Sequence, residues 1–346
     1  MKRKINDNLI TYGIVIAAYI IFQVLALTGH LSSHMKGLLV PMTYYAVIAV
    51  ALNLCVGILG ELSIGHCGFM CIGAFTSAFF SKLTQESLPT APRFFIAFII
   101  GIAFAALFGF LIGIPVLRLK GDYLAIVTLA FGEIIKNVIN AFYIGVDSKG
   151  VHFSLKNSME LGMEKDGNLI VNGAMGITGT PHDSNFTVAV VVLLLSLFVV
   201  QNLVKSRDGR AIMAVRDNYI AAEATGINVT SYKMMAFVIS AAIAGAAGVL
   251  FSHNITTLTA SSQYFGYNAS IMILVYVVLG GIGNIRGSVI AACILYLLPE
   301  LLRGLNTYRM LIYSIVLIVM MIVNWSPKVI EWRKRIFHGR NARNAA

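Results

Sequence analysis

Residues 94–115, FFIAFIIGIAFAALFGFLIGIP, contain no charged side chain and no side chain that donates a hydrogen bond. A helix that crosses a hydrocarbon core of roughly 30 Å needs about 20 apolar residues, and this stretch supplies them. Nine further apolar runs lie at residues 9–28, 37–58, 64–81, 122–143, 185–204, 231–252, 267–283, 287–302 and 308–325. We therefore predict an all-α polytopic membrane protein of about ten transmembrane helices, in which residues 1–346 form a single domain.

The composition agrees with a membrane protein. Of the 346 residues, 58% are hydrophobic and 12% are charged, whereas soluble globular domains have about 45–50% and about 25%. Because so few charged side chains cannot cover a water-facing surface, we exclude a soluble enzyme, a disordered protein and a fibrous protein. The net charge of +11 is explained by the basic cytoplasmic loops of membrane proteins, so we expect no nucleic-acid partner.

The distribution of basic residues predicts the orientation of the chain. Ten spans place both termini on one side, and most of the 26 Lys and Arg residues lie in the loops of that side. By the positive-inside rule, both termini are then cytoplasmic. In this topology residues 144–184 are an extracytoplasmic loop, residues 205–230 are a cytoplasmic loop and residues 326–346 are a basic cytoplasmic tail.

No catalytic or cofactor pattern is present in the sequence. A glycine-rich loop followed by Lys and Ser or Thr is absent, so we expect no ATP binding by that route. The four cysteines and seven histidines show no metal-ligand or redox spacing, and we predict no metal site and no cofactor bound by this chain. Polar groups inside the apolar runs are the informative residues, because each is costly in lipid.

The first polar segment is Gly60-Glu61-Leu62-Ser63-Ile64-Gly65-His66, which follows the second apolar run. It places a carboxylate (Glu61), a hydroxyl (Ser63) and an imidazole (His66) close together. Two explanations stay open. These side chains line the translocation path or its gate, or the segment is a tight cytoplasmic turn whose glycines allow close helix packing.

The second polar segment begins the run at 122–143. Asp122 is placed to cap the helix, since the dipole at a helix N-terminus favours an acid. Tyr123, Thr128 and Glu133 follow, and Glu133 lies roughly 16 Å along the helix by its rise per residue. Lys136 is one turn further on. All but Lys136 are candidates for the translocation path, and a structural Glu133–Lys136 ion pair is an equal alternative.

The third polar segment, residues 206–226, is predicted to form two short helical pieces. Asn218 is a good N-cap, and Gly226 is a good C-terminal stop for a helix over residues 219–225. A short capped helix in a basic cytoplasmic loop suits docking into a groove of another protein. An ordinary surface helix that connects two spans is the alternative.

Two short apolar runs, 64–81 and 287–302, are rich in Gly or Ser, so we expect tilted, broken or buried helices there. Each lies at a glycine-rich turn, Gly57–Gly68 in the first half and Gly280–Gly287 in the second. The two turns occupy comparable positions in the two halves of the chain, which suggests two inverted pseudo-repeats of about five spans each. Such repeats place the transport path at their interface.

Taken in order, these segments resemble the permease subunits of branched-chain amino acid ABC transporters, of the LivM type. The resemblance covers about residues 37–325. It is carried by GELSIGH at 60–66, GDYLAIVTLAFGEI at 121–134, GAMGITG at 173–179, GRAI at 209–212 with AAEATGI at 221–227, and GGIGN at 280–284.

The resemblance implies a bundle similar to type II ABC importers in a bacterial plasma (inner) membrane. Its expected partners are a LivH-type permease, two ABC ATPase subunits of the LivG and LivF type, and an extracytoplasmic substrate-binding protein. The chain itself is then no enzyme, because ATP and Mg²⁺ bind in the partner subunits. It forms the path for Leu, Ile and Val by alternating access. The residues expected to couple to the ATPase are Arg210, Ala222, Glu223, Ala224 and Gly226.

Two other functions stay open. The same architecture can import urea, short amides or another small solute, because selectivity resides mainly in the binding protein. A secondary transporter or channel that works alone would use Glu61, Glu133 or Lys136 for ion coupling. The partner proteins and a transport assay separate these possibilities.

Overall fold

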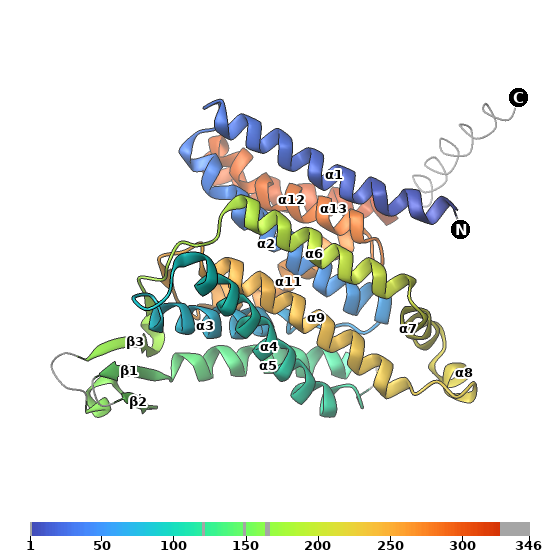
Figure 1. Ribbon diagram of the computed structural model, residues 1–346. Coiled ribbons are helices and arrows are strands. Elements are labelled where there is room, and N and C mark those ends of the chain that lie inside the picture. The colour runs from blue at the N-terminus through green and yellow to red at the C-terminus, as the bar shows by residue number, and fades with distance from the viewer. Residues whose placement is uncertain (1, 120–121, 148–149, 163–166, 326–346) are drawn as a thin grey trace, which may run out of the picture. The chain divides into compact units, whose positions relative to one another are not determined.

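The computed structural model describes residues 2–119, 122–147, 150–162 and 167–325 (Figure 1). The chain divides into two compact units, Met1–Cys293 and Ile294–Ala346. The long helices of the first unit are α1 (Lys2–Leu27), α2 (Ser33–Asn53), α3 (His66–Leu83), α4 (Thr90–Val116), α5 (Asp122–Asn140), α6 (Phe186–Lys205), α9 (Val229–Ser252) and α11 (Tyr267–Gly280). Helix α12 (Ile285–Leu301) crosses the boundary between the units, and a 3₁₀ segment (Leu302–Tyr308) and α13 (Arg309–Trp325) follow it. The predicted helical fold is confirmed.

Eight of the described helical segments are long and apolar enough to cross a membrane. They correspond to eight of the ten predicted runs, and the other two runs form α3 and α13. Helix α3 lies inside the bundle against α4, α5 and α9, and every residue from His66 to Phe75 is buried. Protein therefore surrounds the first ten residues of α3, which agrees with the expectation of a buried helix at 64–81.

The centre of the first unit is packed through small residues of α2, α3 and α9. Residues 46–52 of α2 are all buried. On α9, a Cβ added to Gly248 would lie 2.0 Å from the carbonyl oxygen of Met70 on α3. A Cβ added to Gly73 of α3 would lie 2.4 Å from the carbonyl oxygen of Gly245. Only glycine permits backbones to approach this closely, and close approach is how helices pack in a membrane.

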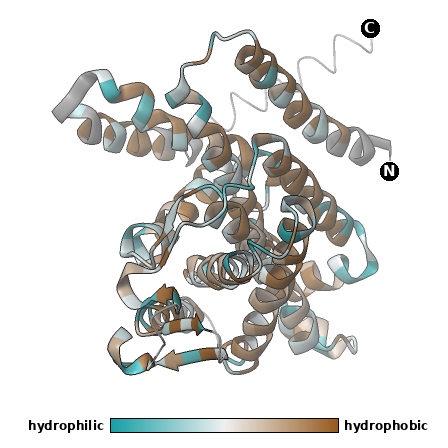
Figure 2. Cartoon of the chain, turned by 60° about the vertical axis from the view of Figure 1, so that its left-hand side comes forward, coloured by the Kyte–Doolittle hydropathy of each residue, from teal (hydrophilic) through white to brown (hydrophobic). Residues whose placement is uncertain are grey.

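The outer helices of this unit expose apolar surface. In the most apolar stretch of α4 only 22% of the residues are buried. The exposed side chains of this helix include Phe95, Phe104 and Phe110. Figure 2 shows the outer helices coloured as hydrophobic along most of their length. A surface of this kind suits the hydrocarbon of a bilayer.

The two ends of the first unit differ. One end, named here the sheet end, carries β1 (Tyr143–Asp147), β2 (Gly150–Ser154) and β3 (Asn168–Asn172) in the antiparallel order β2-β1-β3. There β4 (Ile177–Thr178) also pairs with β5 (Thr257–Leu258), just before the four-residue helix α10 (Ser262–Phe265). The opposite end, the α7–α8 end, carries the short helices α7 (Arg207–Asp217) and α8 (Tyr219–Ala224) (Figure 1).

The strands are an addition to the sequence prediction, which treated residues 144–184 as a loop. The three strands of the larger sheet have five residues each. In strands this short, the alternation of apolar and polar residues is hard to distinguish from the sequence of a loop. The sheet forms because distant segments pair, such as Tyr143 with Asn172.

Candidate functional site

The backbone changes its form where α2 ends. A π-helical turn, Leu54–Leu59, closes the helix, and Gly60 then turns the chain with a φ of 82°. Glycine fits this position because other residues are strained at positive φ. The segment Gly60–Gly65 is not helical, and its Ser63 is fully buried. Protein covers Ser63 and Gly65 of this segment, and non-helical backbone in a membrane protein is tolerated where protein covers it.

His66, the first residue of α3, is buried in a hydrogen-bond network. The Ser240 hydroxyl donates to the Ala51 carbonyl oxygen (2.6 Å), so it accepts from His66 Nε2–H (2.7 Å). In the neutral imidazole, Nδ1 then accepts from the Ser63 hydroxyl (3.0 Å). The network joins α2, α3, α9 and the segment Gly60–Gly65, and it uses both ring nitrogens within the protein.

Glu61 forms an ion pair with Lys233, near the start of α9. The two side chains are only 14% and 15% exposed. The contact joins residues that are 172 positions apart in the sequence. Sequence reasoning identified the carboxylate but not its partner, because nothing in the local pattern indicates which base reaches it.

Thr128 of α5 binds the same segment. Its hydroxyl accepts from the Ile64 backbone N–H (3.1 Å). A Cβ added to Gly65 would lie 2.2 Å from the Thr128 carbonyl oxygen, and one added to Gly68 would lie 2.8 Å from the Cα of Gly132. The glycines after Glu61 therefore let the start of α3 pack directly against α5.

The predicted pairing of Glu133 with Lys136 is present on α5. Lys136 Nζ also donates to Ser262 Oγ (2.9 Å), and Glu133 Oε1 accepts from the backbone N–H of Tyr267 (2.8 Å). Tyr267 is the first residue of α11, so the carboxylate lies at a helix N-terminus, where the dipole favours negative charge. The Glu133 side chain remains 25% exposed.

The predicted path residues divide into three groups. Glu61, Ser63, His66 and Thr128 meet around the segment Gly60–Gly65. Glu133 lies nearer the sheet end with the start of α11. Tyr123 is 70% exposed at the start of α5. The predicted helix cap depends on the side chain of Asp122, which is not among the side chains that the structure describes.

The helix predicted at the α7–α8 end has the predicted caps. Asn218 Oδ1 accepts from the backbone N–H groups of Ile220 and Ala221, each at 3.1 Å, and thereby caps α8. Gly226 ends the helix with a φ of 83°. The helix ends are thus fixed by the local sequence, as the N-cap and C-terminal glycine rules require.

The residues expected to couple to an ATPase lie mostly on the surface of this end. Ala222 is buried, while Glu223, Ala224 and Gly226 are exposed. Arg210 is also exposed and donates to the carbonyl oxygen of Lys205 (3.1 Å). This surface is open to a partner, and the buried Ala222 holds α8 on the bundle.

Sequence reasoning missed Arg216, in the last turn of α7. Its Nη1 donates to the Gly57 carbonyl oxygen (3.0 Å). A Cβ added to Gly60 would lie 2.4 Å from Arg216 Cγ, so the stem of the side chain lies directly on that glycine. The only sequence signal was a basic residue near a helix C-terminus.

The two glycine turns of the sequence prediction lie against each other. Asn53 Oδ1 accepts from the Gly283 backbone N–H (2.8 Å), and Asn53 Nδ2 donates to Ser288 Oγ (2.8 Å). A Cβ added to Gly57 would lie 2.3 Å from Gly283 N. Backbone thus touches backbone between the end of α2 and the turn before α12.

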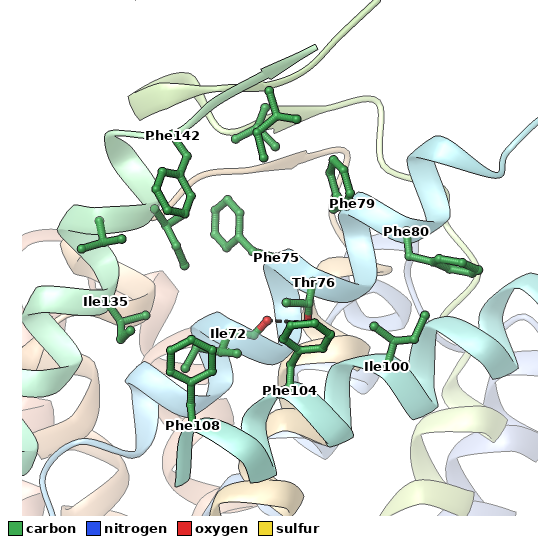
Figure 3. Close-up of a pocket in the computed structure, with 14 residues that line it drawn as sticks. Ile72, Phe75, Thr76, Phe79, Phe80, Ile100, Phe104, Phe108, Ile135 and Phe142 are labelled. Carbon is green, nitrogen blue, oxygen red and sulfur yellow. Dashed lines mark hydrogen bonds between the residues drawn. The ribbon is translucent and has the colours of Figure 1, made fainter. Parts of the chain in front are cut away.

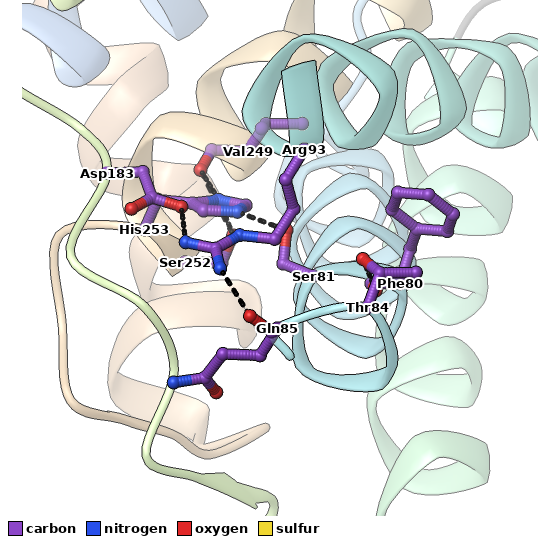
Figure 4. Close-up of polar contacts among 9 residues, drawn as sticks. All are labelled: Phe80, Ser81, Thr84, Gln85, Arg93, Asp183, Val249, Ser252 and His253. Carbon is purple, nitrogen blue, oxygen red and sulfur yellow. Dashed lines mark hydrogen bonds and ion pairs between the residues drawn. The ribbon is translucent and has the colours of Figure 1, made fainter. Parts of the chain in front are cut away.

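A second polar cluster that sequence reasoning missed lies at the sheet end (Figure 4). Arg93, near the start of α4, pairs with Asp183 (2.8 Å), and the two side chains are 8% and 7% exposed. Arg93 Nη1 also donates to the Gln85 carbonyl oxygen (3.3 Å). The only indication of this cluster in the sequence is that Arg93 directly precedes the apolar run 94–115.

His253, just beyond α9, belongs to this cluster. Its Nδ1–H donates to the Val249 carbonyl oxygen (2.9 Å), so Nε2 of the neutral ring accepts from the Ser81 hydroxyl (2.8 Å). Burial lowers the pKa of His253, and the hydrogen bond to Val249 and the nearby Asp183 oppose this shift. The cluster joins α3, α4, the end of α9 and the segment before α6.

An apolar cavity of about 550 Å³ lies between α3, α4 and α5, with Ile144 and Val171 of the sheet beside it. Figure 3 shows Phe75, Phe104 and Phe142 facing it. The Thr76 hydroxyl donates to the Ile72 carbonyl oxygen (2.7 Å). Among the described residues that line it, none is charged, so the cavity offers no group that would bind a charged solute.

No group of three or more His, Cys, Asp and Glu side chains in the described part of the chain could hold a metal ion. The polar sites above are therefore hydrogen-bond networks and ion pairs.

Known proteins similar to this chain identify its family. A family model described as the permease component of a branched-chain amino acid transport system matches residues 34–323. The chain is 36% identical over 303 residues to the high-affinity branched-chain amino acid transport system permease protein LivM of Salmonella typhimurium, over 82% of this chain and 67% of that protein.

Two more distant relatives differ in their described roles. The chain is 26% identical over 253 residues to the corresponding LivH permease protein of Salmonella typhimurium, over 72% of this chain and 79% of that protein. It is 24% identical over 225 residues to the nucleoside ABC transporter permease protein NupC of Lactococcus lactis subsp. cremoris, over 60% of this chain and 64% of that protein. No solved structure matches the chain.

Proposed function

The chain belongs to the family of branched-chain amino acid transport permease components, and we propose that it pairs with a LivH-type permease to form the path of an ATP-driven importer. The chain is a multi-pass membrane protein. Two ABC ATPase subunits of the LivG and LivF type bind and hydrolyse ATP with Mg²⁺, and an extracytoplasmic binding protein delivers leucine, isoleucine or valine. This chain itself binds no cofactor.

The observation that carries this proposal is the exposed, capped helix α8 at one end of the bundle. Its ends are fixed by Asn218 and Gly226, and Glu223 and Ala224 point to solvent. A short capped helix at the end of a membrane bundle is suited to a groove in a soluble subunit. The α7–α8 end is then cytoplasmic, and the positive-inside rule places both chain termini on that side.

Alternating access follows from this arrangement. ATP-driven closure of the two ATPase subunits moves the α7–α8 helices of the permeases, and the two bundles rock between outward-facing and inward-facing states. Such a transition shifts an equilibrium between two conformations of the same molecule. The path binds the solute weakly, since the binding protein supplies selectivity.

Glu133 and Tyr123 face the path in this proposal. Tyr123 is 70% exposed on this chain and the Glu133 side chain is 25% exposed, and a carboxylate that meets lipid is costly. The surface of α5 that carries them therefore faces water or the companion permease. Glu61, Ser63, His66 and Thr128 hold the segment Gly60–Gly65 in place.

Reconstitution of the full transporter in proteoliposomes tests the proposal. ATP is placed inside and the binding protein with labelled leucine outside. We expect ATP-dependent uptake that isoleucine and valine inhibit. Glu223→Arg should abolish uptake by preventing ATPase docking, whereas the same change at the exposed Glu86, in the turn between α3 and α4 at the sheet end, serves as a matched control and should leave uptake unchanged.

A different cargo is the second candidate, because a relative is described as a nucleoside ABC transporter permease. Urea, a short amide and a nucleoside are therefore included as competitors. ATP hydrolysis without leucine uptake would keep the ABC architecture and reassign the cargo. Uptake by this chain alone along an ion gradient, without ATP, would contradict the importer.

A further inference from the structure

Arg216 lies where the C-terminal ends of two helices meet. Helix α7 ends at Asp217, and α2 with its π-helical turn ends at Leu59. The carbonyl groups at a helix C-terminus carry partial negative charge and lack intrahelical partners. The Arg216 guanidinium donates to one of them, the Gly57 carbonyl oxygen, at 3.0 Å. A single cation therefore caps the end of the most buried span from a neighbouring helix.

The Asp217 carboxylate orients the guanidinium. Asp217 Oδ1 accepts from Arg216 Nε (3.0 Å) and Nη2 (2.8 Å), which leaves Nη1 directed at Gly57. Because the guanidinium group is planar, fixing one edge fixes the other. The aliphatic stem of Arg216 lies on Gly60, where any Cβ would clash at 2.4 Å. A displacement of the end of α7 is thus passed to the backbone of residues 57–60.

The end of α2 is in turn in direct contact with the second glycine turn. A Cβ added to Gly57 would lie 2.1 Å from Asn53 Oδ1 and 2.3 Å from Gly283 N. Asn53 also binds Gly283 N–H and Ser288 Oγ, each at 2.8 Å. Gly57 has no side chain of its own, so its backbone lies directly against Gly283 and a shift at Gly57 acts on this contact.

The π-helical turn differs in its hydrogen bonding from the α-helix that precedes it. The Cys55 carbonyl oxygen accepts from the backbone N–H groups of both Gly60 and Glu61, so the last turn is wider than an α-helix. Single π-helical turns inside α-helices are frequent at functional sites. A change to α-helical bonding would rotate the end of α2 and change which carbonyl group Arg216 meets.

We propose that Arg216 transmits the movement of α7 and α8 to the π-helical turn Leu54–Leu59 and, through Gly57, to the glycine turn Gly280–Gly287. The contact makes these two turns respond together to the ATPase subunits. This inference rests on the proposed function and deepens it, because Arg216 acts as a positioning residue for the transport cycle. The physical basis is the contiguous set of contacts from Arg216 to Gly57 and from Gly57 to Gly283.

The first test measures leucine transported per ATP hydrolysed by the reconstituted transporter. Arg216→Ala should lower this ratio by about tenfold, within the range found for mutations that disturb coupling. Gly60→Ala should reproduce the effect, because it displaces the Arg216 stem. Since both variants break one contact, the double variant should be no worse than either single variant. Arg207→Ala, at the other end of α7, is the matched control and should keep the wild-type ratio.

A purely structural role would give a different result. If Arg216 only caps α2, Arg216→Ala lowers the amount of assembled complex and changes uptake and ATP hydrolysis in proportion. An unchanged ratio in correctly assembled complexes would therefore overturn the inference. Arg216→Lys keeps the charge but not the planar fork, so it should assemble like the wild type and still show the lowered ratio.

The second test does not depend on the cargo. Amide hydrogen exchange in residues 54–60 is measured in the full complex with and without a non-hydrolysable ATP analogue. We expect the nucleotide to change protection in the wild type and to have no effect on these amides in Arg216→Ala. Equal responses in the two proteins, or no response in the wild type, would overturn the inference. A wild type that shows the response but carries no leucine would contradict the proposed cargo alone.

Discussion

The sheet end and the α7–α8 end of the first unit each contain an ion pair, and the two pairs differ in how deeply they are buried. At the sheet end, Arg93 and Asp183 are less than one-tenth exposed, and His253 packs beside them with both ring nitrogens bonded. At the other end, Glu61 and Lys233 are about twice as exposed. The Arg93–Asp183 pair therefore has little access to water, and the Glu61–Lys233 pair retains more.

This difference bears on which end can move. A buried charge that loses its partner has no water to replace it, so the contacts at the sheet end oppose any local opening. Arg216 and Asp217 at the α7–α8 end are exposed enough to exchange protein contacts for water. Movement on the scale of a transport cycle is therefore expected at the α7–α8 end, while the sheet end holds its elements together.

The largest expected effect comes from breaking the buried pair at the sheet end. Arg93→Ala leaves the Asp183 carboxylate buried without its partner, which should cost about 3–5 kcal/mol of unfolding free energy. Thermal unfolding in detergent measures it. Lys156→Ala, which breaks an exposed pair with Glu160 at the same end, is the control and should change stability by less than about 1 kcal/mol. Equal losses in the two variants would contradict the contrast between buried and exposed pairs.

A smaller loss is expected at the α7–α8 end. Glu61→Ala should cost about 2 kcal/mol, because partial exposure lets water reach the remaining Lys233 ammonium. The Glu61→Gln/Lys233→Gln double variant removes both charges and should lose less than the sum of the single changes. The same unfolding assay applies. A loss for Glu61→Ala that exceeds the loss for Arg93→Ala would reverse the comparison.

Removal of the α8 cap tests the exposed part of the α7–α8 end. Asn218→Ala removes the acceptor for two backbone N–H groups and should destabilise α8 by about 1 kcal/mol. Because α8 lies at the end of the bundle, we expect the midpoint of global unfolding to stay nearly unchanged while hydrogen exchange in residues 219–224 accelerates. Cooperative loss of the whole bundle in this variant would show that α8 is not a locally unfolding element.

The smallest expected effect is a pH dependence of the unfolding free energy that arises from His253 at the sheet end. Burial keeps the pKa of His253 below the ordinary value of about 6.5, so the unfolded chain binds a proton there before the folded protein does. Stability should therefore fall as pH decreases below about 6.5, by at most about 1.4 kcal/mol per pH unit. His253→Asn should weaken this dependence in unfolding scans at pH 7.5 and 5.5. Identical pH dependence in both proteins would exclude His253 as the cause.

Local sequence patterns predicted those features that depend on neighbouring residues. The apolar runs predicted the long helices, Asn218 and Gly226 predicted the ends of α8, and the i, i+3 spacing predicted the Glu133–Lys136 pair. Each of these depends on the period of one helix or on one turn of backbone. The Asn218 and Gly226 caps in particular need no information about the rest of the fold.

Contacts between distant segments could not be predicted in this way. Glu61 was a candidate from the start, but its pairing with Lys233 spans 172 residues, and the Arg216 contact with Gly57 spans 159. The Glu61 motif was also assigned to a path or a turn with equal weight. The structure shows that its Ser63 and His66 are bonded within the core, which no spacing rule contains.

The sequence by itself therefore determined that this chain is a helical membrane protein with a capped helix at the end of one loop, because hydrophobic length and backbone capping are local properties. Only the tertiary structure decided which polar groups meet. Ion pairs and glycine contacts form wherever packing brings distant backbones within a few ångströms. The approach of Gly57 to Gly283 and the position of Arg216 on Gly60 are consequences of how α2, α7 and the turn before α12 pack together.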